Sequence, residues 1–393
     1  HNIERAWVYS FAWHILPALL AISLYQLKWT PIKLNIFISA LIIGGVASCL
    51  IVMDQHYKWT DWSHKLPRIG YGGLIYNQNF AAEYHAPILP LGMGLFFFVK
   101  SKFLKGFLLC SMAFVFMPAL ALSLARGAWV GLIGGSFITC LIFCIIIFLK
   151  KKDLGPKKLS LWVGGSFLIL ALTLPLYLFT SNYWKKGALA IDTINSEKPT
   201  SIETKHILSV ATISEPSAGS GRRVVLWKDA LLATLSKDFL FGLGTDHYEL
   251  HFHETAQHSD KTTGGTLVRF VHNDYIQILY ENGIIGLIGF LGLWIVVILK
   301  SFFRAFECAK ENNVPELGLI LGITASCLTF LIESFFEFPT RSPCSMVVGW
   351  ASLGLLIVVV YQKSPENSSN RVKQIGSKFN LFIAAAAFSI ITY

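Results

Sequence analysis

One histidine and a group of arginines are the residues of this chain whose types and positions fit chemistry at a membrane surface. His272 stands where a polar stretch, 181–270, meets the next apolar segment, and an imidazole can accept a proton near neutral pH. The arginines stand in segments between or beside apolar runs: Arg126, Arg222, Arg223 and Arg341. Guanidinium groups suit phosphate oxygens, because their planar forks make two-point contacts. The combination predicts a general base beside a site for a lipid-linked diphosphate.

The same residues also have plainer interpretations. Each arginine can snorkel independently from the end of a span, and an interfacial histidine can be purely structural. His247 and His251 have the spacing of two zinc ligands on one helix face, but no clear third ligand accompanies them. We therefore interpret them as solvated loop residues and expect no metal site. The sequence has no phosphate-binding loop, no Rossmann fingerprint and no Asp-x-Asp pair, so we expect no cofactor.

Composition places these residues on a membrane protein. Apolar residues make up 54% of the chain and charged residues 14%, far from the balance of a soluble domain. Several apolar runs are long enough to cross a hydrocarbon core of about 30 Å as helices. We predict an all-α polytopic membrane protein with about ten transmembrane helices. The predicted spans are 8–27, 34–53, 80–99, 106–124, 128–149, 160–180, 283–299, 315–335, 344–361 and 380–393.

The distribution of positive charge predicts how the spans are oriented. Lysine and arginine gather in the short loops of one side, most densely at Lys150–Lys158, and are sparse in the short segments of the other side. Short loops rich in positive charge stay in the cytoplasm. We therefore expect 181–270, Arg126 and the turn Glu337–Arg341 on the outer face. The net charge of +10 then reflects topology, and no nucleic-acid partner is expected.

The predicted organisation is a single membrane domain interrupted by one large loop. Residues 1–180 would form the first six spans, 181–270 the loop, and 271–393 a re-entry helix with the remaining spans. Within the loop, apolar residues at helical spacing predict an amphipathic helix over Gly221–Asp238 that lies on the bundle. Its apolar face would consist of Val224, Leu226 or Trp227, Leu231, Leu232 and Leu235.

Local signals also define the segment that follows the loop. Asn273 or Asp274 can cap a helix and Asn282-Gly283 can end it, so 274–282 should form a short helix directly after His272. The next span carries a ridge of glycines that predicts close helix packing: Gly283, Gly286, Gly289 and Gly292. The chain begins with His1 rather than Met, and its last apolar run is short for a crossing. We expect it to be a piece of a longer protein.

A set of motifs, in this order, resembles the O-antigen ligase and polymerase superfamily of bacterial envelope glycosyltransferases. They are Gln78–Ala82, Ser123–Trp129, Gly221–Trp227, Phe241–Gly244, His272–Gly286 and Phe338–Pro343. The large outer loop followed by a His-Asn-Asp-Tyr helix is the most specific part of the set. The resemblance implies a GT-C-like fold with a large periplasmic loop that contains amphipathic helices, in a multi-pass protein of the bacterial inner membrane.

The resemblance also implies an activity and roles for residues. It implies metal-independent, inverting transfer of a glycan from an undecaprenyl diphosphate carrier to an acceptor hydroxyl at the periplasmic face. His272 would be the base or would orient the acceptor, while Arg126 and Arg223, with Arg222 and Arg341 as further candidates, would hold the diphosphate. Besides membrane lipids, the partners would be the lipid-linked donor and an acceptor.

Several acceptors and one other class of function stay open at the sequence level. Ligases that act on lipid A-core, polymerases that act on a growing glycan and protein O-oligosaccharyltransferases share the scaffold, and we favour ligase-like transfer. Outside this class, a multispan transporter of an anionic lipid or glycan would also gather arginines at one face. Such a transporter is expected to have broken helices or charges at mid-membrane, whereas the predicted spans carry few charges.

Overall fold

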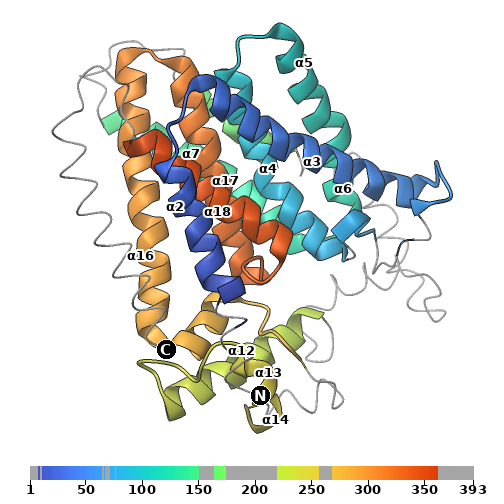
Figure 1. Ribbon diagram of the computed structural model, residues 1–393, viewed down its shortest axis with the longest axis vertical. Helices are drawn as coiled ribbons and strands as arrows, with labels where there is room; N and C mark the ends of the chain where they lie inside the picture. Colours follow the sequence, from blue (N-terminus) through green and yellow to red (C-terminus); the bar gives the residue numbers. More distant parts are fainter. Residues whose placement is uncertain are drawn as a thin grey trace. The chain divides into compact units, whose positions relative to one another are not determined.

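The computed structural model describes residues 8, 11–63, 66, 71–75, 77–149, 163–173, 219–255 and 268–361. All elements in these ranges are helical and none is a β-strand, which confirms the predicted all-α membrane fold (Figure 1). The predicted span 380–393 lies outside the described residues, and 160–180 is described only as a short apolar helix, Val163–Thr173.

Six helical segments of the described chain are long and apolar enough to cross a membrane. They are α3 (Pro31–Tyr57), the run Lys102–Leu122, α7 (Arg126–Leu149), α16 (Asp274–Glu311), α17 (Val314–Phe336) and α18 (Pro343–Tyr361). The run Lys102–Leu122 joins α5 (Lys102–Ser111), a π-helical turn η4 (Met112–Phe116) and α6 (Met117–Leu122). The predicted span 80–99 corresponds to the largely buried α4 (Gln78–Phe98), and 8–27 to the shorter η1 (Phe11–Ile15) and α2 (Leu16–Gln26).

The chain divides into two compact units. The first, here the loop unit, contains His1–Ser10, Thr173–Ile288 and Phe335–Phe338. The second, here the bundle unit, contains Phe11–Leu172, Gly289–Ser334 and Pro339–Tyr393. The loop unit therefore includes Phe335–Phe338, which lie at the C-terminal end of α17 and directly after it. These four residues contribute directly to the candidate site.

Glycines allow helices of the bundle unit to pack closely on α17. A Cβ on Gly94 of α4 would lie 3.0 Å from the Cα of Gly322, and a Cβ on Gly131 of α7 would overlap the side chain of Glu333. The hydroxyl of Ser345 in α18 donates a hydrogen bond to a backbone carbonyl at the start of α4 (3.4 Å). These contacts place the starts of α4, α7 and α18 beside the end of α17.

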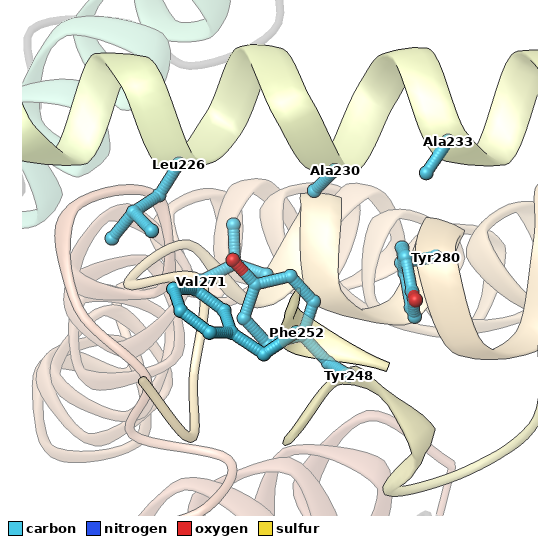
Figure 2. Packing of buried hydrophobic residues seen from close by; sticks show 7 residues of the cluster. All are labelled: Leu226, Ala230, Ala233, Tyr248, Phe252, Val271 and Tyr280. Carbon is cyan, nitrogen blue, oxygen red and sulfur yellow. The ribbon is translucent and has the colours of Figure 1, made fainter. Parts of the chain in front are cut away.

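The loop unit is built around α12 (Gly219–Lys237), which confirms the predicted amphipathic helix (Figure 1). Its buried face packs on the short helices α13 (His247–Leu250) and α14 (Phe252–Thr255) and on the start of α16 (Figure 2). The cluster consists of Leu226, Ala230, Ala233, Tyr248, Phe252, Val271 and Tyr280.

The predicted apolar face of this helix is wrong in part. Val224, Leu232 and Leu235 are exposed, whereas the small side chains Ala230 and Ala233 are buried. Small residues allow the helix backbone to approach the rings of the cluster, so size as well as polarity decides which face turns inward. The helix therefore presents a second apolar surface away from its core.

A break at Gly283 separates the re-entry helix from the membrane span within α16, as predicted. Gly283 has φ 64° and ψ −172°, a conformation that essentially only glycine adopts. The turn 239–244 satisfies backbone groups left open on both sides of the break. Its four hydrogen bonds run from Leu243 N to Tyr280 O (2.7 Å), Gly244 N to Glu281 O (3.0 Å), Ile284 N to Phe239 O (2.9 Å) and Ile285 N to Leu240 O (3.4 Å).

The glycine ridge does not pack closely, contrary to the prediction from its spacing. A Cβ on Gly289 or Gly292 would meet nothing within 4 Å in the described chain, and one on Gly286 would meet Asn282 of the preceding turn. A Cβ on Gly283 would overlap the carbonyl of Leu240. Of the regularly spaced glycines, Gly283 is required by the backbone conformation of the break, whereas Gly289 and Gly292 have free space where a side chain would lie.

Gly283→Ala is expected to destabilise the protein by roughly 1–3 kcal/mol, because alanine is strained at this φ and ψ and its methyl group would displace the turn 239–244. Thermal unfolding of the detergent-purified chain should show a lower Tm. Gly289→Ala in the same helix is the matched control and should leave Tm unchanged or slightly higher. Equal Tm values for the two variants would contradict the role of the break.

Candidate functional site

The backbone just before His272 is held by two side chains. The indole Nε1 of Trp227 in α12 donates to the carbonyl of Val271 (3.0 Å), and the N–H of Val271 donates to Oε1 of Gln277 (2.8 Å). His272 itself has φ 59°, in the left-handed region that few residues other than glycine occupy. Such a conformation persists only where the surroundings impose it, and it is common at functional sites.

The residue after His272 is also fixed. Of the two caps that the sequence predicted, Asn273 is the N-cap of α16, since its Oδ1 accepts from the N–H of Ile276 (3.0 Å). Its Nδ2 donates to the carbonyl of Phe335 (2.9 Å), which joins the start of the re-entry helix to the end of α17. His272 is therefore held between two anchored neighbours, and its ring direction is set by the fold.

The ring of His272 faces the carboxylate of Glu337. Nδ1 of His272 lies 3.4 Å from Oε2 of Glu337, and the ring of Phe338 packs edge-on at a centroid distance of 4.8 Å. Arg223 of α12 donates through Nη2 to Oε1 of Glu337 (2.6 Å) and through Nη1 to the carbonyl of Phe336 (2.7 Å). One carboxylate thus accepts from both a histidine and an arginine.

The electrostatics of this group favour an ionised Glu337. Its side chain is only 5% exposed, and burial alone would raise the pKa of the carboxyl. The hydrogen bond from His272 and the positive charge of Arg223 outweigh burial and hold the pKa of Glu337 below its ordinary value. The hydrogen-bond network assigns the proton of a neutral His272 to Nδ1, which leaves the lone pair of Nε2 as an acceptor. The ring remains 31% exposed, so this acceptor is suited to a general base.

Arg126 and Arg341 belong to the bundle unit. Arg126 is the first residue of α7, and Arg341 is buried just before α18. Two fully buried acids, Glu83 of α4 and Glu333 of α17, occupy the same end of the unit because of the helix pairing described above. Each of these four residues takes part in an interaction within the protein. This end of the bundle therefore collects both arginines and carboxylates.

The predicted site residues fall into these two separate groups. His272 and Arg223 meet at Glu337 in the loop unit, and Arg126 and Arg341 share one end of the bundle unit. Arg222 precedes Arg223 in α12, and its side chain is outside the described part of the structure. The rings of His247 and His251 stack at 5.7 Å, and His251 pairs with Glu254 (3.1 Å). In the described ranges, no group of three or more His, Cys, Asp or Glu side chains is placed to hold a metal ion.

Three acidic residues of these groups were missed from the sequence: Glu83, Glu333 and Glu337. Few charges stand in the predicted spans, and the acids among them have no arginine close by in the sequence. Because burying a charge is costly, an acid inside an apolar run needs a partner, and this rule could have identified Glu83 and Glu333. Glu337 follows directly after a span in Phe335-Phe336-Glu337-Phe338, and its aromatic surroundings were a weaker signal.

Comparison with known proteins confirms the resemblance found in the motifs. Residues 111–291, just under half of the chain, match the family model described as O-antigen ligase. The matched segment contains Arg126, Arg223 and His272 but not Glu337 or Arg341. An uncharacterized protein of Haemophilus influenzae is 26% identical over 253 residues, which cover 63% of this chain and 54% of that protein. The chain thus spans about half the length of the curated relative that it matches.

Glu337→Gln is expected to lower the free energy of unfolding by about 1–3 kcal/mol at neutral pH, since it removes the charge from two hydrogen bonds. The pKa of Glu337 is depressed in the folded protein, so its stabilisation is complete above the ordinary value of 4.5. The stabilisation is lost as pH falls through the lower, folded pKa. Tm measured against pH should therefore show a difference at pH 7 that shrinks in acid.

The matched control is Glu307→Gln, which removes an exposed carboxylate from an ion pair with Arg304 (3.0 Å). Exposed pairs contribute roughly 0–1 kcal/mol, so little change is expected. A Glu337 variant that is as stable as the Glu307 variant at neutral pH would contradict the buried ion pair.

Proposed function

We propose, on the premise that residues 111–291 match the O-antigen ligase family, that this protein transfers a glycan from a lipid-linked diphosphate to an acceptor hydroxyl. The observation that carries the proposal is the His272–Glu337–Arg223 group, a base oriented by a carboxylate at the water-side end of a span. The donor would be a glycan on undecaprenyl diphosphate, and the site would face the periplasm from the bacterial inner membrane. Transfer to lipid A-core is the favoured reaction; glycan polymerisation or transfer to protein would use the same chemistry.

His272 would act on the acceptor. Nε2 takes the proton of the acceptor hydroxyl as its oxygen attacks the anomeric carbon of the donor sugar. The bond between that carbon and the diphosphate oxygen breaks, and its electron pair leaves with the diphosphate. Attack from the face opposite the leaving group inverts the anomeric centre. Glu337 stabilises the imidazolium that forms, because its negative charge lies at Nδ1.

Arginines would bind the leaving diphosphate. Arg223 uses one N–H toward Glu337 and one toward the carbonyl of Phe336, and a guanidinium has further N–H groups for phosphate oxygens. Arg126 and Arg341 bring two more guanidinium groups, with Arg222 next to Arg223 in the chain. Their positive charge would stabilise the leaving group without a metal ion, as in other sites where fixed charges meet a developing anion.

The positions of the buried acids favour an interfacial enzyme over a transporter. Glu83 lies in the second turn of α4, and Glu333 lies in the last turn of α17. A transporter site near the bilayer midplane would be expected to place such charges in the middle of the spans. These acids instead lie near helix ends, on the side where Phe336 leads into Glu337.

His272→Ala is expected to reduce glycan transfer by roughly 10²–10⁴-fold, because the acceptor loses its base. Transfer can be measured as restoration of surface glycan in cells that lack the gene, with the amount of inserted protein determined in parallel. His251→Ala is the matched control, since His251 pairs with Glu254 away from Glu337. Near-normal transfer by a well-expressed His272 variant would rule out the assignment.

Replacing Arg126 or Arg223 with alanine is expected to abolish most use of the donor, and lysine should restore it only in part. Lysine keeps the charge but loses the planar fork. The double alanine variant should lose no more than the sum of the two single losses in free energy, because residues that share one ligand are not additive. Full activity of both lysine variants would instead support independent snorkelling, for which a long cationic side chain is sufficient.

Arg126→Lys is the cleaner of the two substitutions. Arg223 also fixes Glu337, so its replacement disturbs the orientation of His272 as well as any phosphate contact. Measuring the rate of transfer as a function of acceptor concentration separates the phosphate contact from the orientation of His272. Only loss of Arg223 should also change the acceptor concentration that transfer requires.

A further inference from the structure

The N-terminal end of α12 is attached to the C-terminal end of a membrane span, α17. Nη1 of Arg223 donates to the carbonyl of Phe336, the last residue of α17, at 2.7 Å. One turn later, the ring of Trp227 packs edge-on against Phe335 at a centroid distance of 5.7 Å. This end of α12 is therefore attached to the last two residues of α17, where its apolar run ends.

The C-terminal end of α12 leads into the turn 239–244, which is attached to the start of the span in α16. The carbonyls of Phe239 and Leu240 accept hydrogen bonds from the N–H groups of Ile284 and Ile285, the first residues after the break in α16. The apolar part of α16 begins at these residues. Both ends of α12 are thus fixed at the water-side ends of spans, and its 19 residues cover about 28 Å between them. An amphipathic helix attached in this way can lie along the membrane surface.

The face of α12 that points away from its core is apolar. Val224 and Leu235 are 58% and 62% exposed, and they lie on one side of the helix because a step of eleven residues makes just over three turns. Leu232 is exposed beside them, and Phe239, Leu240 and Phe241, which follow α12 in the chain, are exposed as well. Lys228 lies on the same face, where its long side chain can follow apolar surface and place its charge among headgroups.

We propose that this surface, the outer stripe, is a docking site for the lipid surface of the membrane. The outer stripe consists of Val224, Leu232, Leu235, Phe239, Leu240 and Phe241. Amphipathic helices bind bilayers with an apolar face at the boundary between headgroups and acyl chains, and aromatic residues favour that depth. The inner face of α12 packs on its core, so among the described residues of the helix the outer stripe is the apolar surface left exposed to lipid. This inference concerns how the loop unit is held and does not depend on the proposed glycan transfer.

Photocrosslinking of the full chain tests the proposal directly. A benzophenone amino acid would replace Leu235 or Leu240 in protein reconstituted into vesicles of phosphatidylethanolamine and phosphatidylglycerol. The matched control position is Glu254 of α14, which is 65% exposed and pairs with Lys237 (3.5 Å). It belongs to the short helix whose Phe252 packs in the core on the inner face of α12. Mass spectrometry after irradiation counts phospholipid adducts at each position.

We expect adducts at Leu235 and Leu240 to be several-fold more frequent than at Glu254. Equal frequencies at the three positions would overturn the proposal, because the outer stripe would then face water. Crosslinks between two protein chains at Leu235 or Leu240, in place of lipid adducts, would also overturn it by showing that a second copy covers the outer stripe. Thermal unfolding of each labelled protein verifies that the substitution at these exposed positions leaves the fold intact.

Discussion

The carboxylate of Glu337 accepts hydrogen bonds from two side chains that lie far from it and from each other in the sequence. Arg223 comes from the amphipathic helix α12 and His272 from the start of the re-entry helix, while Glu337 follows directly after a membrane span. A buried carboxylate without these partners would be costly, so the ion pair requires the three segments to meet. The contact therefore joins the water-side segment to the end of α17 and orients the candidate base at the same time.

Two backbone devices support this contact. Gly283 breaks α16, and the turn 239–244 bonds to both sides of the break, so the backbone groups that the break leaves open are satisfied. Trp227, Gln277 and Asn273 hold the residues on either side of His272. The candidate site is thus built from short elements attached to the ends of spans. Lipid contact by the outer stripe of α12 would hold the same elements at a constant depth.

Strong local signals predicted much of this structure. Apolar run length indicated the spans, and the Asn273 cap and Asn282-Gly283 defined the re-entry helix. The inner face of α12 was harder, because helical spacing does not reveal that Ala230 and Ala233 are buried against large rings while Leu235 is exposed. The partner of His272 could not be found by spacing, since Glu337 is 65 residues away and only the fold brings it near. The regular spacing of Gly283, Gly286, Gly289 and Gly292 suggested a packing surface, because spacing alone does not reveal that Gly283 serves a break in the backbone.

We infer that Glu337 holds His272 with its proton on Nδ1 and leaves Nε2 as an acceptor. Nitrogen-15 NMR of histidine-labelled protein in lipid bilayers measures this directly, with the signals of His272 assigned by their absence in His272→Gln. We expect a protonated Nδ1 and an unprotonated Nε2 for neutral His272, and loss of this preference in Glu337→Gln. A neutral His272 with its proton on Nε2 in the unaltered protein would contradict the account.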